Sequence, residues 1–159
     1  MDLRSYQIIS EWQHLAILAA TELHANFSLA ELARLLKIED AKLKESMDRL
    51  ISLGLIEFTQ GKYKKKFSSN LVKSKDKNSG LQQFHKEMLL KAIDALDEQD
   101  NAKKYTGTIT LAIDPKQIPE LQEVFRSFLR KVLRVADKSK KKERVYHLSL
   151  NFFDLFGER

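Results

Sequence analysis

Residues 49–67 read RLISLGLIEFTQGKYKKKF, and this stretch decides the fold expected for the first half of the chain. An apolar helix end runs into Gly54, a residue suited to the left-handed conformation that stops a helix. Two short strand-like runs, LIEFTQ and YKKKF, then flank Gly61 in the order of a hairpin. A helix that leads straight into a two-stranded hairpin is typical of the end of a winged helix.

Three helices are predicted ahead of this hairpin. The segment ISEWQHLAILAATEL, residues 9–23, repeats apolar residues at helical spacing. In SLAELARLLK, residues 28–37, Ser28 and Glu31 have the spacing of a capping box, and Asp40 is placed to cap a third helix. The last two helices stand about three residues apart, as in a helix-turn-helix pair. Residues 1–72 are therefore predicted to form a winged helix-turn-helix domain.

The sequence of the second half predicts a separate domain with a different fold. SGLQQFHKEMLLKAIDALDEQ, residues 79–99, is a long helix with a wide apolar face. The period-two patterns of residues 105–114 and 144–153 predict strands, and Asp114 with Pro115 starts the helix between them. Residues 73–80 are expected to be a basic linker and residues 81–159 a small α-β-α-β domain with a right-handed parallel crossover. The expected fold class is α+β.

The net charge of +6 is concentrated in two zones. Residues 61–80 carry seven basic residues and one acid, and residues 126–144 carry nine basic residues and two acids. A basic wing suits phosphates, because each neutralised phosphate releases counterions. Lysine-rich edge strands also prevent aggregation, and lysine-rich linkers are often only solvated, so that alternative stays open. The residues expected to contact double-stranded DNA are Lys62, Lys64, Lys65 and Lys66 of the wing and Lys42, Lys44 and Arg49 of the third helix.

The third helix reads bases in most winged helices, yet here it is poorly charged for that task. Residues 39–49 hold three basic residues against four acids. We therefore expect modest sequence discrimination, with most of the affinity coming from the phosphate backbone.

Motifs for chemistry are missing from the sequence. There is no cysteine, no glycine-rich phosphate loop, no HExxH and no acidic cluster at metal-ligand spacing, so no enzyme activity, metal or cofactor is expected. His85 and His147 are placed to meet across the second domain, although a lone histidine on a helix face is more often a core group. No apolar run would span a membrane and no signal peptide is evident, which predicts a cytoplasmic protein.

Two strands are too few to form an independent sheet with satisfied edges. Pairing with a second copy across a two-fold axis would give a four-stranded sheet, so a homodimer is expected. The alternative is an edge shielded by the chain's own helices or by the wing domain. Phe153, Leu155 and Phe156 continue past the last strand without local cover, which places them in or beside an interface.

Taken together, five segments carry a family resemblance: ISEWQHLAIL, RLISLGLIE, FHKEMLLKAIDAL, ITLAIDPKQIPELQEVFRSFLRKVL and VYHLSLNFF. From about Ile8 to Phe153 the chain resembles the C-terminal region, classed as a domain of unknown function, of a bacterial family of predicted helix-turn-helix transcriptional regulators. The resemblance implies a role in regulation. Longer members carry a separate helix-turn-helix segment ahead of this region. The alternative to DNA binding is therefore a protein-interaction or ligand-sensing module that keeps the winged shape.

Overall fold

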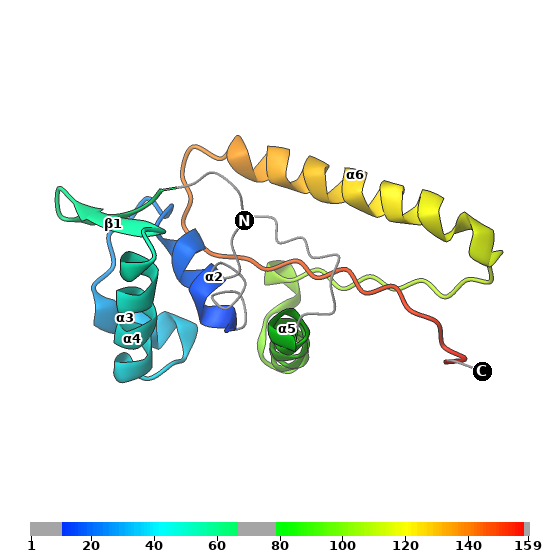
Figure 1. The fold of residues 1–159 in the computed structure, drawn as a ribbon, viewed down its shortest axis with the longest axis horizontal. Helices are drawn as coiled ribbons and strands as arrows, with labels where there is room; N and C mark the ends of the chain where they lie inside the picture. The colour runs from blue at the N-terminus through cyan, green and yellow to red at the C-terminus, as the bar shows by residue number, and fades with distance from the viewer. Residues whose placement is uncertain (1–10, 67–78, 158–159) are drawn as a thin grey trace.

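The computed structural model describes residues 11–66 and 79–157, and over these residues the protein is mixed α+β. It is elongated: three helices and a hairpin gather at one end, and a long helix with two extended segments reaches toward the other (Figure 1). Five α-helices and two short 3-10 helices accompany a sheet of only two strands in the described residues.

Residues 11–66 contain the predicted order of three helices and a hairpin. The helices are α2 (Trp12–Ala20), α3 (Leu29–Leu36) and α4 (Asp40–Ser52). Strands β1 (Ile56–Thr59) and β2 (Lys62–Lys65) pair antiparallel, with Thr59 opposite Lys62 beside the turn. Gly54 has φ +66°, so the predicted left-handed stop after α4 is confirmed.

The capping box at the start of α3 is also confirmed. The Ser28 hydroxyl accepts a hydrogen bond from the Glu31 N–H at 3.2 Å, and the Glu31 carboxylate accepts one from the Ser28 N–H at 2.8 Å. The prediction for α4 was wrong by one residue. Glu39 is the residue before the helix, its side chain makes no capping hydrogen bond, and Asp40 is the first helical residue. There its charge still favours the positive end of the helix dipole.

Replacing Ser28 with alanine should lower the free energy of unfolding by about 1 kcal/mol, because the Glu31 backbone N–H loses the hydroxyl that accepts its hydrogen bond. Urea denaturation followed by circular dichroism measures the change. Asn26→Ala, at an exposed position just before the cap, is the matched control. Equal stability of the two variants would contradict a stabilising role for the box.

The core of this unit lies between α2, α3, α4 and β1. Ile17, Leu43, Leu50 and Ile56 are fully buried at its centre. Helix α2 packs on two sides. Ile17, Leu18 and Ala20 enter the main core, while Trp12 and Leu15 pack against a second cluster.

That second cluster joins the two halves of the molecule. It is built on Phe84 and Met88 of α5 (Ser79–Glu98). The Trp12 backbone N–H donates to a carboxylate oxygen of Glu87 at 3.3 Å. The Lys91 ammonium lies 3.5 Å from the centre of the Trp12 ring. α5 begins at Ser79, inside the predicted linker, and the rest of that linker lies outside the described residues.

The long helix of the second half is α6 (Ile118–Asp137), preceded by the 3-10 turn η2 (Pro115–Gln117). Its predicted start is confirmed, because the Asp114 carboxylate accepts from the Lys116 N–H at 3.0 Å with Pro115 in the first turn. Another 3-10 turn, η1 (Asn101–Lys103), follows α5.

The predicted sheet of the second half does not form. Residues 105–113 and 144–153 are extended (Figure 1), but among the described residues no backbone hydrogen bond joins them. The α-β-α-β prediction was therefore wrong in its β part. An alternating pattern predicts that a segment is extended and has one buried face. A hydrogen-bonded ladder also needs a neighbouring strand in register, and the pattern of one segment does not specify that strand.

Candidate nucleic-acid interface

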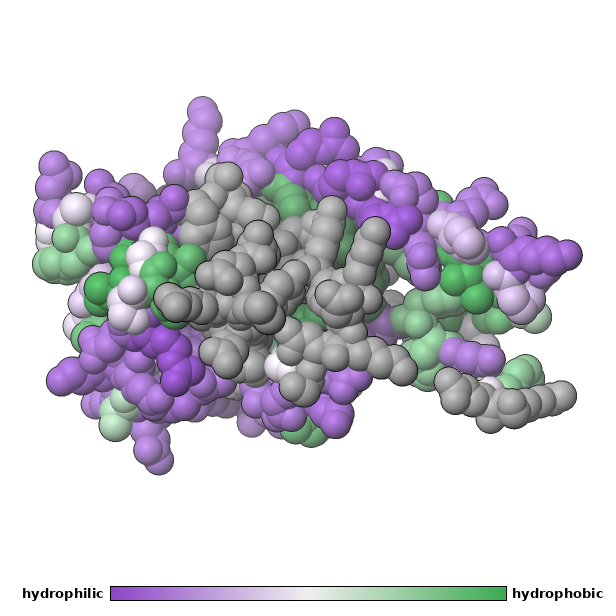
Figure 2. Space-filling view, in the orientation of Figure 1, coloured by the Kyte–Doolittle hydropathy of each residue, from purple (hydrophilic) through white to green (hydrophobic). Residues whose placement is uncertain are grey.

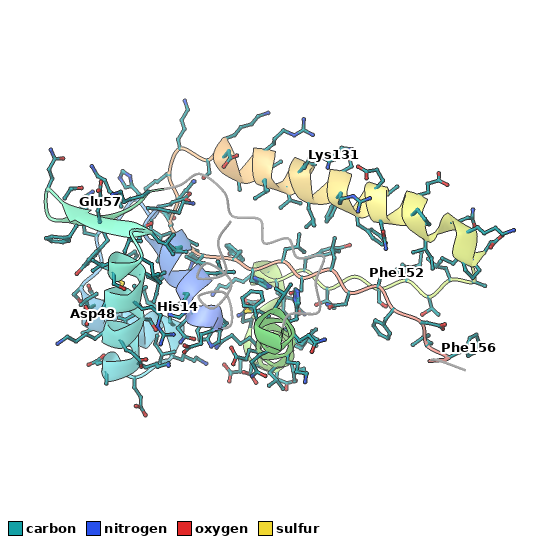
Figure 3. All side chains as sticks on the ribbon, viewed as in Figure 1. His14, Asp48, Glu57, Lys131, Phe152 and Phe156 are labelled. Carbon is teal, nitrogen blue, oxygen red and sulfur yellow. The ribbon has the colours of Figure 1, made fainter. Side chains whose placement is uncertain are left out.

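The seven predicted DNA contacts gather at one end of the molecule. Lys42, Lys44 and Arg49 lie on α4, and the wing lysines lie on or just after the hairpin. Figure 3 shows this end through Asp48 of α4 and Glu57 of β1. The seven residues therefore lie on two neighbouring elements, α4 and the hairpin.

Two of the α4 cations are neutralised by acids. The Lys42 ammonium lies 2.6 Å from a carboxylate oxygen of Glu11, and the Arg49 guanidinium lies 2.9 Å from the other. Glu45 approaches both cations at 3.5 Å. Burial acts to raise the pKa of Glu11, but hydrogen bonds from Lys42 and Gln13 outweigh it and hold that pKa below its ordinary value. Lys42 and Arg49 thus stabilise the packing of the chain before α2 on α4.

Lys65 is turned inward. Alternation along β2 places it with Tyr63, on the opposite side from Lys64. Its side chain is only 8% exposed, and its ammonium forms an ion pair with Glu22. Glu22 also accepts a hydrogen bond from Lys142 at 2.6 Å. Lys65 therefore does not present its charge to an outside phosphate.

Of the seven predicted contacts, three are exposed cations without an ion pair to a described residue. Lys66 has an exposed partner, Glu57, at 3.5 Å. Lys44, Lys62 and Lys64 are exposed, and none of them forms an ion pair with a described residue. The field of this surface is consequently smaller than the count of lysines suggests.

A larger open field lies on α6 and the turn after it. Arg126 and Arg130 share Glu123, at 2.7 and 3.4 Å. Figure 2 shows the hydrophilic residues along α6, and Figure 3 shows Lys131 on its outer side. The nine basic residues of 126–144 are visible in the sequence, but their spacing alone did not indicate a role for them. The cations here without an ion pair to a described residue are Lys131, Arg134, Lys138, Lys140 and Arg144.

A hollow of about 120 Å³ beside the hairpin is lined mainly by apolar side chains, including Ile17, Met47 and Phe58. In residues 11–66 and 79–157 no three histidine, aspartate or glutamate side chains gather as metal ligands. The helices within these same ranges are too short or too polar to cross a bilayer.

His85 and His147 do approach each other, with Phe84 between them. Their rings stand edge-on to Phe84 at centroid distances of 5.6 and 6.0 Å. Burial, and secondarily the charge of His85, lowers the pKa of His147 below its usual value. This arrangement is a packing contact of the C-terminal segment on α5, although both histidines remain exposed.

Comparison with known proteins gives one match. A family model described as a domain of unknown function matches residues 1–155. No curated protein and no solved structure matches the sequence.

Proposed function

The chain belongs to the family of the domain of unknown function DUF4423, and we propose that it is a transcriptional regulator whose first half, a winged helix-turn-helix, binds double-stranded DNA. Most of the affinity comes from phosphates. The second half serves for dimerisation or sensing.

The order and spacing of the first-half elements support this proposal. Helices α3 and α4 are separated only by residues 37–39, and Lys37 takes the left-handed conformation at φ +54°. The hairpin follows α4 after three residues and pairs antiparallel. A helix pair with a short turn, followed by a two-stranded ribbon, is an arrangement that places a helix and a wing on adjoining parts of a duplex.

The observation that carries the proposal is the set of exposed cations without an acid partner. Lys62 and Lys64 lie on the hairpin and Lys44 on α4, whereas the neighbouring Lys42, Arg49 and Lys65 are held by carboxylates. The acids thus restrict the positive surface to a few positions. Three such positions favour weak, salt-dependent contact with the backbone and little reading of bases.

A salt titration tests the contact. Binding of the 159-residue chain to random duplex DNA should follow log affinity against log salt with a slope of about −0.9 per phosphate contact. Lys62→Glu with Lys64→Glu should remove about two contacts, so the slope becomes shallower by roughly 2 and affinity falls for every sequence alike. Fluorescence anisotropy across salt concentrations measures both quantities.

The matched control is Lys103→Glu with Lys116→Glu, which makes the same change in net charge outside the first half. Lys42→Ala is a second control, because its ammonium is already paired with Glu11. Equal losses in the hairpin and control double variants would mean that net charge alone attracts the duplex. Loss of binding on Lys42→Ala would place the contact on α4 instead.

The neutralised surface of α4 favours a second candidate, a protein-interaction or ligand-sensing module that keeps the same shape without binding DNA. The same titration separates the two functions. A chain with no measurable affinity for duplex DNA at low salt is the result expected of the second candidate, because three open lysines near a phosphate backbone would otherwise give detectable binding.

A further inference from the structure

The second half of the molecule lacks a core of its own. From Leu89 to Gly157 no residue is buried. Eighteen of the 22 large hydrophobic side chains exposed among the described residues lie between Leu89 and Phe156. Monomeric proteins rarely leave apolar surface of this extent open to water, so an unmet partner is indicated.

Helix α6 shows this most directly. Its apolar residues recur at spacings of three and four, yet Val124, Phe128 and Val135 are 55%, 45% and 73% exposed. The opposite face is charged. An amphipathic helix in a folded protein lays its apolar stripe on a core, and here only part of that stripe is covered.

The extended segments of residues 105–113 and 144–153 are also incomplete. His147 packs on Phe84 of α5, whereas the Phe152 ring stands 5.4 Å from Phe125 of α6. Residues an odd number apart on an extended chain face opposite sides, so this segment lies between the two helices. Its backbone groups, and those of residues 105–113, form no ladder with described residues. Two such segments leave unpaired edges that accept other strands.

Helix α5 offers the complementary surface. On the side away from Phe84, its exposed apolar residues are Leu89, Leu90, Ile93 and Leu96. The charges around this stripe are negative: residues 87–100 hold five acids and one lysine, whereas residues 126–144 hold nine basic residues and two acids. The apolar stripe of α5 thus has an acidic border, and the apolar face of α6 has a basic one.

We propose that two copies of this chain form a dimer through residues 104–157, each copy keeping its own segment. The apolar face of α6 in each copy covers the stripe of α5 in the other, and the extended segments of both copies complete one ladder. This assembly is independent of DNA binding.

The choice of a second copy as the occupant rests on complementarity within the sequence itself. The acidic border of α5 and the basic border of α6 attract each other only where the two helices face. Within one chain the extended segments lie between these helices (Figure 1), so the α6 that faces the α5 stripe is that of a second copy. Across a two-fold axis the α6 of each copy contacts the α5 of the other. Both contacts are then formed within one dimer, and no surface is left to bind a third copy. Stable interfaces use about 20–30 residues from each partner, and the exposed apolar residues with their charged borders are enough for that.

Charge exchange tests the proposal. The wild-type chain should have twice its 18.5 kDa mass at micromolar concentration in light scattering or sedimentation equilibrium. Two double variants should each raise the dimer Kd by about tenfold or more, because like charges then meet across the interface: Asp94→Lys with Asp97→Lys on α5, and Lys131→Glu on α6 with Lys138→Glu just after it. Combining all four substitutions in one chain should restore the dimer, since the borders are again opposite.

The matched control is Lys62→Glu with Lys64→Glu in the hairpin, which should leave the dimer unchanged. Monomer mass at every concentration would overturn the proposal. A dimer that tolerates either charge-reversed pair would also overturn it, because the contact would then lie elsewhere. Circular dichroism of each variant establishes that its helices are intact, and recovery in the four-fold variant separates a broken interface from a misfolded chain.

Discussion

Leu50→Ala should lower the free energy of unfolding by about 3 kcal/mol, within the range measured for leucine truncations in tightly packed cores. Leu50 is 0% exposed and belongs to the cluster that joins α2, α3, α4 and β1. Truncation removes apolar contacts and leaves a cavity that its neighbours fill only in part. In so small a unit this is a large fraction of the total stability.

Chemical denaturation of the full chain, followed by circular dichroism, measures this loss. Leu35→Ala makes the same chemical change on α3, where the side chain is 52% exposed, and should lower the free energy of unfolding by less than about 1 kcal/mol. Similar losses for the two variants would show that α4 does not hold the centre of the core.

Glu22→Gln should have the second largest effect, a loss of about 2 kcal/mol, because it leaves a nearly buried ammonium without its counter-charge. The Glu22 carboxylate binds Lys65 of the hairpin and Lys142 of the segment after α6. The exposed pair of Lys141 with Glu143 is the control, and Glu143→Gln should change the free energy of unfolding by less than about 0.5 kcal/mol. Equal stability of Glu22→Gln and the wild type would mean that water replaces the carboxylate without loss.

Acid should reveal the same ion pairs. Burial acts to raise the pKa of Glu22, but hydrogen bonds from Lys142 and Lys65 outweigh it and hold the pKa below the ordinary 4.5. The native state therefore binds the proton less readily than the unfolded chain. Stability from this group is complete above about pH 4.5 and is lost as the pH falls through the native value. The wild type should lose its advantage over Glu22→Gln in denaturation curves taken across that range.

Local signals made the helices of this chain predictable. The hydrogen bonds of the Ser28 and Glu31 box, the left-handed Gly54 and the Asp114 cap each involve residues within a few positions of one another. Periodicity also located α5 and α6 to within a few residues. Such features follow from sequence because short-range geometry fixes both partners.

The charges of the candidate interface depend on contacts between residues far apart in the sequence, which spacing alone does not reveal. Glu11 neutralises Lys42 and Arg49 across 31 and 38 positions, and Glu22 holds Lys65 from another element. Counting charges along α4 therefore found its weak field but not which cations are engaged. The predicted strands failed for a related reason, since their ladder needs a partner that their own pattern does not name.

Glu22 also links the hairpin to the last segment of the chain. Its carboxylate holds the hairpin through Lys65 and the start of the last segment through Lys142, and the Lys142 carbonyl accepts a hydrogen bond from the His24 N–H at 2.7 Å. A displacement of the last segment must then alter the hairpin that carries Lys62 and Lys64. If the hairpin binds DNA as proposed, this link couples the second half to duplex affinity. Such coupling is reciprocal, so a ligand of the second half and the duplex would change each other's affinity by the same factor.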